Sequence, residues 1–326
     1  MRISAQASRN LDMLCLLNTL TADEYYVKRH REVFDRFYPA LSQGVRDGMA
    51  AMVAGQGYAM LSPALTLMVS ALDGFQERSL TDMLACHGEI EKAMARTEYG
   101  FSREAYDRYF AFFTDTAIPL IEELEGLGFE AFWRAERLPA IEAKRAALEA
   151  YLQNYRAEDM INVYKPFDCQ DLTVYICAFA APHGIKLCGY NLISDVSYPE
   201  ATILSNITHE VFHPPFDYGR VRPSLDALAQ KPAVIRAFAN QNPHSGYHDM
   251  DGFIEEHVVE ALGIHVLARL GADIDPAGYF KTHDEGSHVI SPYLYEYLAQ
   301  NPKDPAAAFE DYFAGFADSL GAGDLC

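Results

Sequence analysis

The segment His209–His213, with the sequence HEVFH, constrains the fold of this chain more than any other feature. On an α-helix, residues four apart lie above one another on one face, so the two imidazoles point the same way. The residues before and within the segment have an apolar side formed by Ile203, Leu204, Ile207 and Val211. Pro214 and Pro215 follow directly, and proline cannot continue a helix. We therefore expect a helix that ends at these prolines and presents two histidines together.

Two imidazoles at this spacing suit a single small metal ion. Zn²⁺ accepts nitrogen ligands at about 2.0–2.1 Å in tetrahedral geometry. Glu210 lies one residue further around the helix, close to the metal's water rather than on the metal. Since zinc lowers the pKa of its water towards about 7, a carboxylate there can act as the general base. The sequence thus predicts one Zn²⁺ per chain, held by His209 and His213, with Glu210 as the base.

A catalytic zinc site needs a third protein ligand and one open position. Phe216 and Gly219 stand where a metzincin would have a glycine and its third histidine, so that class is excluded. A later helical pattern, residues 253–271, carries three acidic residues: Glu255, Glu256 and Glu260. The last two share a helix face among apolar neighbours, which favours a third ligand from this face.

The HEVFH segment together with residues 256–262, EHVVEAL, resembles the HExxH…ExxxE arrangement of gluzincin metallopeptidases. The gap is similar to that of compact members such as the lethal-factor-like peptidases. The helical N-terminal half is also similar to uncharacterised bacterial proteins that carry a gluzincin domain. The motif resemblance covers about residues 172–265. It implies that Glu256 binds zinc and that Glu260 holds a ligand histidine from outside the coordination shell.

Gluzincins also supply a tyrosine or histidine that stabilises the oxyanion of the tetrahedral intermediate. Residues 245–248, with the sequence SGYH, stand shortly before the helix of the third ligand, in a place comparable to the lethal-factor-like tyrosine. The resemblance implies Tyr247 as the first choice and His248 as the second. His288 and Tyr293, from a later helix, are the alternatives.

The pattern along the chain predicts an α+β fold. Apolar residues three and four apart dominate the first 160 residues, and Pro119 and Pro139 should kink or split helices there. Residues 171–180 and 184–196 are rich in strand-forming residues. Later helices are expected at residues 223–240, 251–271, 288–300 and 304–320. We expect a helical N-terminal domain, residues 1–160, and a zincin-like catalytic domain, residues 161–326, with a small mixed sheet and an HExxH helix.

Composition limits the partners of the chain. Its 326 residues are 50% hydrophobic and 22% charged, which is typical of a globular protein, and the formal net charge of −20 repels nucleic acid. The sequence has no run of about 18 apolar residues, so no membrane-spanning helix is predicted. Six scattered cysteines favour free buried thiols, with a Cys177–Cys188 bridge as the alternative in an exported protein. The sequence leaves open the oligomeric state, and whether the protein is cytoplasmic or exported with a leader absent here.

The function expected from these features is that of a zinc-dependent metallohydrolase, a peptidase acting on peptide or protein substrates. In that mechanism Glu210 deprotonates the water and passes the proton to the leaving amine. One alternative is a catalytically silent zinc-binding interaction protein, and another is a helical binding module whose motif is fortuitous. The presence of Glu210 favours the hydrolase, because a scaffold has no need of a general base.

Overall fold

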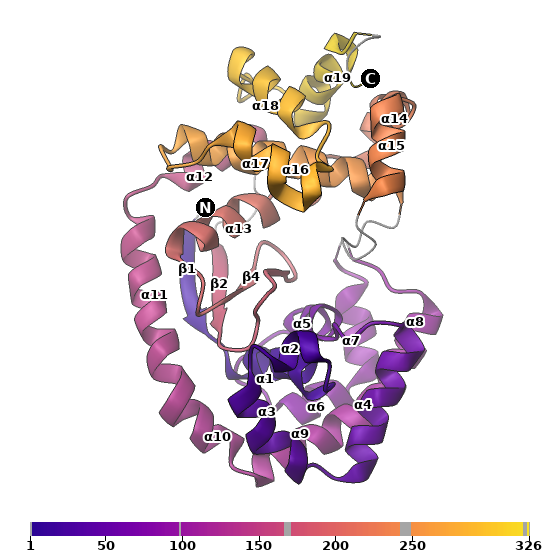
Figure 1. Ribbon diagram of the computed structural model, residues 1–326, viewed down its shortest axis with the longest axis vertical. Helices are drawn as coiled ribbons and strands as arrows, with labels where there is room; N and C mark the ends of the chain where they lie inside the picture. Colours follow the sequence, from indigo (N-terminus) through magenta and orange to yellow (C-terminus); the bar gives the residue numbers. More distant parts are fainter. Residues whose placement is uncertain (1, 98, 166–170, 242–248, 322–324, 326) are drawn as a thin grey trace. The chain divides into compact units, whose positions relative to one another are not determined.

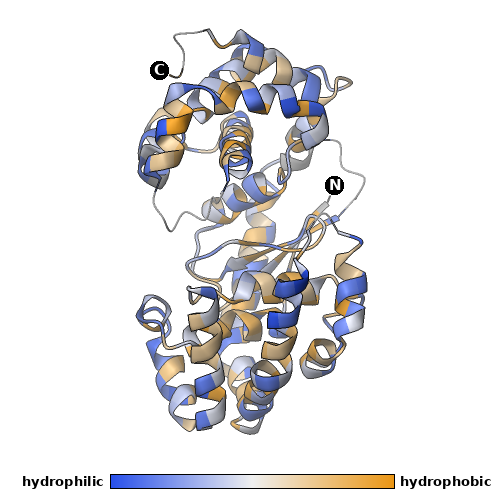
Figure 2. Ribbon diagram, turned by 90° about the vertical axis from the view of Figure 1, so that its right-hand side faces the viewer, coloured by the Kyte–Doolittle hydropathy of each residue, from blue (hydrophilic) through white to orange (hydrophobic). Residues whose placement is uncertain are grey.

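A computed structural model describes residues 2–97, 99–165, 171–241, 249–321 and 325 (Figure 1). The chain forms two compact units. The N-terminal unit comprises Ile3–Ala150 and Asp171–Pro199, and the C-terminal unit comprises Met1–Arg2, Tyr151–Gln170 and Glu200–Cys326. Hydrophobic and hydrophilic residues alternate around the helices, as expected for helices that bury one face (Figure 2).

Helices dominate the first half of the chain. They are α1 (Arg9–Leu20), α2 (Glu24–Val27), α3 (Arg31–Phe37), α4 (Gln43–Gln56), α5 (Ser62–Ser70), α6 (Leu80–Ala85), α7 (His87–Met94), α8 (Arg103–Phe112), α9 (Ile118–Gly126), α10 (Phe129–Phe132) and α11 (Leu138–Leu152). A short 3₁₀ helix, Tyr38–Ala40, follows α3. The predicted helical character of this region is therefore observed.

Both prolines predicted to disturb helices follow a π-helical segment. Phe113–Ala117 connects α8 to α9 ahead of Pro119, and Trp133–Arg137 connects α10 to α11 ahead of Pro139. Proline has no N–H to donate, and its ring clashes with the carbonyl four residues earlier. A π turn widens the helix before each proline. The helix is therefore altered locally at these points but is not interrupted.

Four strands form a small mixed sheet in the order β1 (Arg2–Ala7), β2 (Asp171–Cys177), β4 (Leu192–Asp195) and β3 (Ile185–Lys186). Strands β2 and β4 are parallel, whereas β3 and β4 are antiparallel. The mixed α+β class is thus as predicted, and the second expected strand is divided into β3 and β4. Strand β1 was not predicted, because its six residues depend on a partner far along the chain.

Helix α1 is buried on almost every side, and it packs against β2 and α5. Its one buried carboxylate, Asp12, accepts hydrogen bonds at both oxygens. The Oδ1 atom accepts the N–H groups of Ala178 (2.7 Å) and Phe179 (3.1 Å), and Oδ2 accepts the indole N–H of Trp133 (2.6 Å). Asp12 therefore joins α1 to the chain that leaves β2 and satisfies backbone groups that the sheet does not.

Asp12 should make the stability of the protein pH-dependent. Burial raises the pKa of Asp12 to about 7, although its three hydrogen bonds lower it. A carboxyl whose pKa rises on folding is stabilising below its unfolded pKa, and this contribution is lost as the pH rises through the folded pKa. Between pH 4 and pH 8, the free energy of unfolding measured by urea denaturation should fall by on the order of 4 kcal/mol because of this group. Asp12→Asn should flatten that part of the profile, and an unchanged profile would contradict this assignment.

Helices also form the C-terminal unit. They are α12 (Ala157–Tyr164), α13 (Glu200–Glu210), α14 (Tyr218–Ala229), α15 (Pro232–Asn240), α16 (Met250–Arg269), α17 (Pro276–Thr282), α18 (Ser291–Gln300) and α19 (Phe309–Ser319), with a 3₁₀ segment His283–Gly286 after α17. The helix predicted at 223–240 is two helices, and the last one begins five residues later than predicted. Helix α16 is central, since α12, α13, α14 and α18 all pack against it.

The two units divide the chain differently from the expected boundary at residue 160. Strands β2, β3 and β4 group with the N-terminal helices, whereas α12 groups with the later helices. The physical reason is the sheet, because β2 pairs beside β1 and contacts α1. The HExxH segment therefore belongs to a helical unit, and the strands before it belong to the other unit.

Two further expectations concern the described residues. Among them, no helix is both long and apolar enough to cross a bilayer. Cys15, Cys86, Cys177 and Cys188 form no disulfide bond with one another. Cys15 and Cys177 are buried as predicted, whereas Cys86 is exposed, and the alternative bridge between Cys177 and Cys188 is not formed. Cys169 and Cys326 lie outside the described residues.

Candidate metal centre

Helix α13 ends at Glu210, earlier than the prolines had suggested. The N–H groups of Phe212 and His213 donate to carbonyls three residues back, at 3.1 and 3.3 Å, so the chain tightens into a turn. The ammonium group of Lys165 donates to the carbonyl of Pro214 at 2.8 Å. His209 is thus presented by the helix, whereas His213 is presented by the anchored turn after it.

Helices α13 and α16 approach closely at Gly263. A Cβ atom built there would lie 3.2 Å from the carbonyl oxygen of Thr208 and 3.5 Å from the Cα atom of His209. Glu256 and Glu260 lie on the same face of α16 as Gly263, at helical spacings of seven and three residues. The missing side chain at position 263 therefore lets both carboxylates reach the end of α13.

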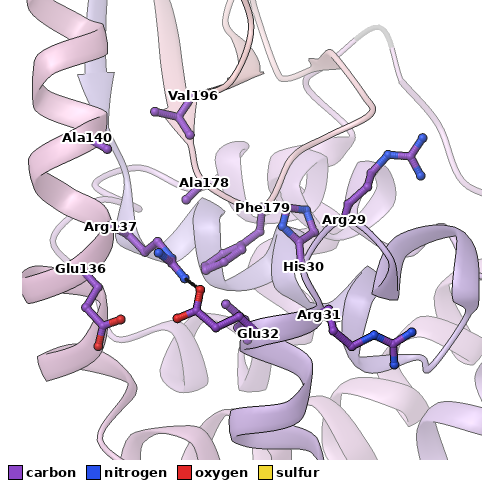
Figure 3. A pocket seen from close by; sticks show the side chains of 11 residues that line it. Arg29, His30, Arg31, Glu32, Glu136, Arg137, Ala140, Ala178, Phe179 and Val196 are labelled. Carbon is purple, nitrogen blue, oxygen red and sulfur yellow. Dashed lines mark hydrogen bonds and ion pairs between the residues drawn. The ribbon is translucent and has the colours of Figure 1, made fainter.

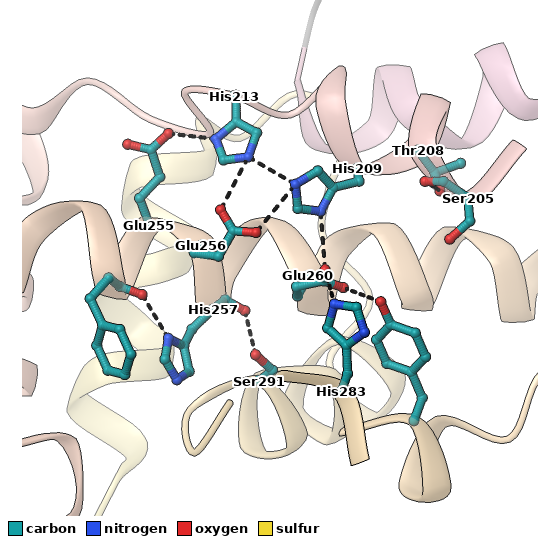
Figure 4. Close-up of polar contacts among 12 residues, drawn as sticks. Ser205, Thr208, His209, His213, Glu255, Glu256, His257, Glu260, His283 and Ser291 are labelled. Carbon is teal, nitrogen blue, oxygen red and sulfur yellow. Dashed lines mark hydrogen bonds and ion pairs between the residues drawn. The ribbon is translucent and has the colours of Figure 1, made fainter. Parts of the chain in front are cut away.

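Three potential ligands meet between these helices (Figure 4). The Nε2 atoms of His209 and His213 are 3.1 Å apart. The two oxygens of Glu256 lie 3.3 Å from His209 Nε2 and 3.5 Å from His213 Nε2. In a tetrahedral zinc site with bonds near 2.0–2.1 Å, neighbouring ligand atoms are roughly 3.3–3.4 Å apart. The residues fit a single small divalent cation.

The other nitrogen of each histidine faces a second carboxylate. Nδ1 of His209 lies 3.3 Å from Glu260 Oε1, and Nδ1 of His213 lies 2.8 Å from Glu255 Oε1. A carboxylate on Nδ1 keeps the proton there and leaves the lone pair of Nε2 for a metal ion. Both imidazoles are therefore oriented so that their Nε2 atoms converge.

These outer carboxylates have partners of their own. The hydroxyl of Tyr279 donates to Glu260 Oε2 at 3.1 Å, and Nε2 of His283 lies 3.4 Å from Glu260 Oε1. The hydroxyl of Tyr218 donates to Glu255 Oε2. The carboxylate beside each histidine is thus fixed by a further contact of its own. This limits the motion of the two imidazoles.

The carboxylates give the centre a strongly negative potential. Burial lowers the pKa of His209, but the Glu256 charge and the hydrogen bond with Glu260 outweigh burial and raise it to about 10. Burial would raise the pKa of Glu260, but the hydrogen bonds from His209 and His283 hold it well below its usual range. A centre that stabilises a proton on His209 so strongly favours positive charge, and a divalent cation would take the place of that proton.

The remaining predicted residues have different outcomes. Glu210 is half-buried at the end of α13, and its charge contributes to the raised pKa of His209. Tyr247 and His248 lie outside the described residues. His288 is 2% exposed, and its ring is tilted against those of His257 and His283, with centroids 5.1 and 5.3 Å away, while Tyr293 on α18 is 40% exposed.

Four residues of this network were not assigned to it from the sequence: Tyr218, Glu255, Tyr279 and His283. In the sequence, Glu255 is only one of three acidic residues in the later helical pattern. A motif helix that continued straight to the prolines would give no reason for Glu255 to face His213. The early end of α13 turns His213 towards it. The other three lie in separate helices or turns, and no spacing in the sequence points to them.

Glu255 provides a test of the outer contacts. Glu255→Ala should weaken metal binding by about 10–100-fold without abolishing it, because His213 loses its orienting acceptor but keeps Nε2. Tyr218→Phe should have a smaller effect in the same direction. Competition with a chromophoric chelator measures both affinities. Glu296→Ala on α18 is a matched control, since that carboxylate is exposed, and an unchanged affinity in Glu255→Ala would contradict the orienting role.

The N-terminal unit contains a separate cavity of about 290 Å³ (Figure 3). Inside it, Arg137 Nη2 lies 3.3 Å from Glu32 Oε2, so these opposite charges compensate one another. The His30 ring meets Phe179 edge-on, with centroids 5.6 Å apart. Among the described residues, no group of three metal-ligating side chains occurs at this cavity, and the metal centre is the stronger candidate site.

No family model, curated protein or solved structure matches the chain.

Proposed function

We propose that this chain is a zinc-dependent metallohydrolase of the gluzincin type, and most specifically a peptidase. The observation that carries the proposal is the convergence of His209 from α13, His213 from the turn after it and Glu256 from α16. Three protein ligands leave one position of a tetrahedral ion open, which is the pattern of catalytic rather than structural zinc. The zincin likeness that we infer is confined to this pair of helices.

When bound, a zinc ion would lower the pKa of a water molecule and polarise a carbonyl. The protein's own side chains would hold the ion and transfer the proton. His209 and His213 are oriented by Glu260 and Glu255, and Glu256 supplies the carboxylate of the ligand set. In this proposal Glu210 accepts a proton from water and donates it to the leaving amine. In this proposal an oxyanion donor comes from the region of Tyr247 and His248.

Cleavage of a peptide library by the zinc-loaded protein tests the proposed function. We expect cleavage that stops on addition of a chelator and returns when zinc is restored. Zinc binding without any cleavage across diverse peptides would instead favour the catalytically silent interaction protein. A protein that binds no divalent ion would overturn both assignments.

A further inference from the structure

A second group of metal-ligating side chains lies beside the first. Glu260, His283 and His288 have ligand atoms within 4.8 Å of one another. Glu260 comes from α16, and the two histidines come from the segment between α17 and α18. Glu260 and His288 are 6% and 2% exposed, while His283 is more accessible. Two imidazoles and one carboxylate form the same ligand set as in the first group.

The two groups are joined through His209. Its Nε2 faces Glu256 and its Nδ1 faces Glu260, whose Oε1 also lies 3.4 Å from His283 Nε2. The imidazole ring therefore separates the first cluster from the second (Figure 4). An ion at the second cluster would share no ligand atom with the first, but it would compete with His209 for the carboxylate of Glu260.

The charges around the pair of clusters favour a second cation. Glu255, Glu256 and Glu260 are all largely buried, and half-buried Glu210 adds a fourth carboxylate. One divalent ion compensates two negative charges and leaves two. Carboxylates withdrawn from water are costly unless paired with positive charge or a metal.

We propose that Glu260, His283 and His288 form a second divalent-cation site that takes zinc or a similar transition metal. Its ligand atoms all lie within 4.8 Å of one another, and Glu260 Oε1 and His283 Nε2 are 3.4 Å apart, close to the roughly 3.3–3.4 Å between ligand atoms of a tetrahedral zinc site. Because an ion at this site competes with Nδ1 of His209 for the carboxylate of Glu260, the second ion binds more weakly than the first. This proposal does not depend on hydrolysis, and it deepens the proposed function only by adding an ion next to the catalytic one.

Equilibrium dialysis of the metal-free full chain against increasing Zn²⁺ tests the proposal. We expect two equivalents of zinc with at least a tenfold difference in affinity. His283→Gln and His288→Gln should each remove the weaker equivalent. His288→Gln should leave the affinity of the tighter equivalent unchanged, whereas His283→Gln should weaken it without removing it, because His283 also contacts Glu260. His265→Gln is the matched control, because His265 is a buried histidine like His288 but lies on α16, where its ring contacts Tyr164 and Tyr295. Circular dichroism checks folding, and the more exposed His283 keeps the test available if His288→Gln unfolds.

The outcomes separate this proposal from the proposed function. A single equivalent that is lost in His213→Ala and retained in both His283→Gln and His288→Gln would overturn the second site and leave the first. A single equivalent lost only in the His283 and His288 variants would overturn the first site and leave the second. One ion lost equally in both sets would show that all these residues support one centre, which also overturns the two-site arrangement.

Discussion

Glu210→Gln is expected to retain zinc and to lose about 10²–10⁴-fold in the rate of peptide hydrolysis, the range that a positioned general base contributes. Glutamine is nearly isosteric with glutamate but cannot accept a proton at neutral pH. Glu210 is not part of the convergent group formed by His209, His213 and Glu256. Removing its charge should therefore spare the ligand set and affect only proton transfer.

The measurement is kcat on a substrate found in the peptide library, with zinc content determined on the same preparation. Glu200→Gln is a suitable control, because Glu200 lies at the opposite end of α13. Activity in Glu210→Gln comparable to wild type would exclude the base role. Loss of zinc together with activity would instead place Glu210 among the ligands.

Glu256→Ala should reduce zinc affinity by more than about 100-fold, which exceeds the usual effect of changing an outer-shell partner. The carboxylate of Glu256 reaches Nε2 of both His209 and His213, at 3.3 and 3.5 Å. Without it, the remaining two imidazoles leave two positions of a tetrahedral ion to solvent. His213→Ala should show a loss of the same order for the same reason.

Isothermal titration of the metal-free variants with Zn²⁺ measures this loss. The comparison with Glu255→Ala is decisive, because Glu255 is the adjacent carboxylate on α16 and contacts Nδ1 of His213 instead. We expect Glu255→Ala to bind zinc measurably and Glu256→Ala to bind it far more weakly. The reverse order would exchange the roles of the two carboxylates.

Local patterns predicted the parts of the centre that depend on one helix. The i, i+4 spacing places His209 and His213 together, and the same spacing places Glu256 and Glu260 on one face. The meeting of the two pairs was inferred from the chemistry of a three-ligand site. In the structure it depends on the close approach at Gly263, which a single sequence does not reveal.

Long-range contacts account for what the sequence did not predict. Strand β1 exists because β2 pairs beside it, and that pairing also assigns the strands to the N-terminal unit. Glu255 reaches His213 because α13 ends at Glu210 and the chain turns before the prolines. No spacing in the sequence points to His283, yet the fold brings it to Glu260.

Anomalous diffraction at the zinc absorption edge, on crystals of the protein with one equivalent of zinc, would locate the ion relative to His209, His213 and Glu256. We expect a peak about 2.0–2.2 Å from the Nε2 atoms of His209 and His213 and from an oxygen of Glu256. A peak bound elsewhere on the chain, with no density between these three side chains, would contradict this expectation.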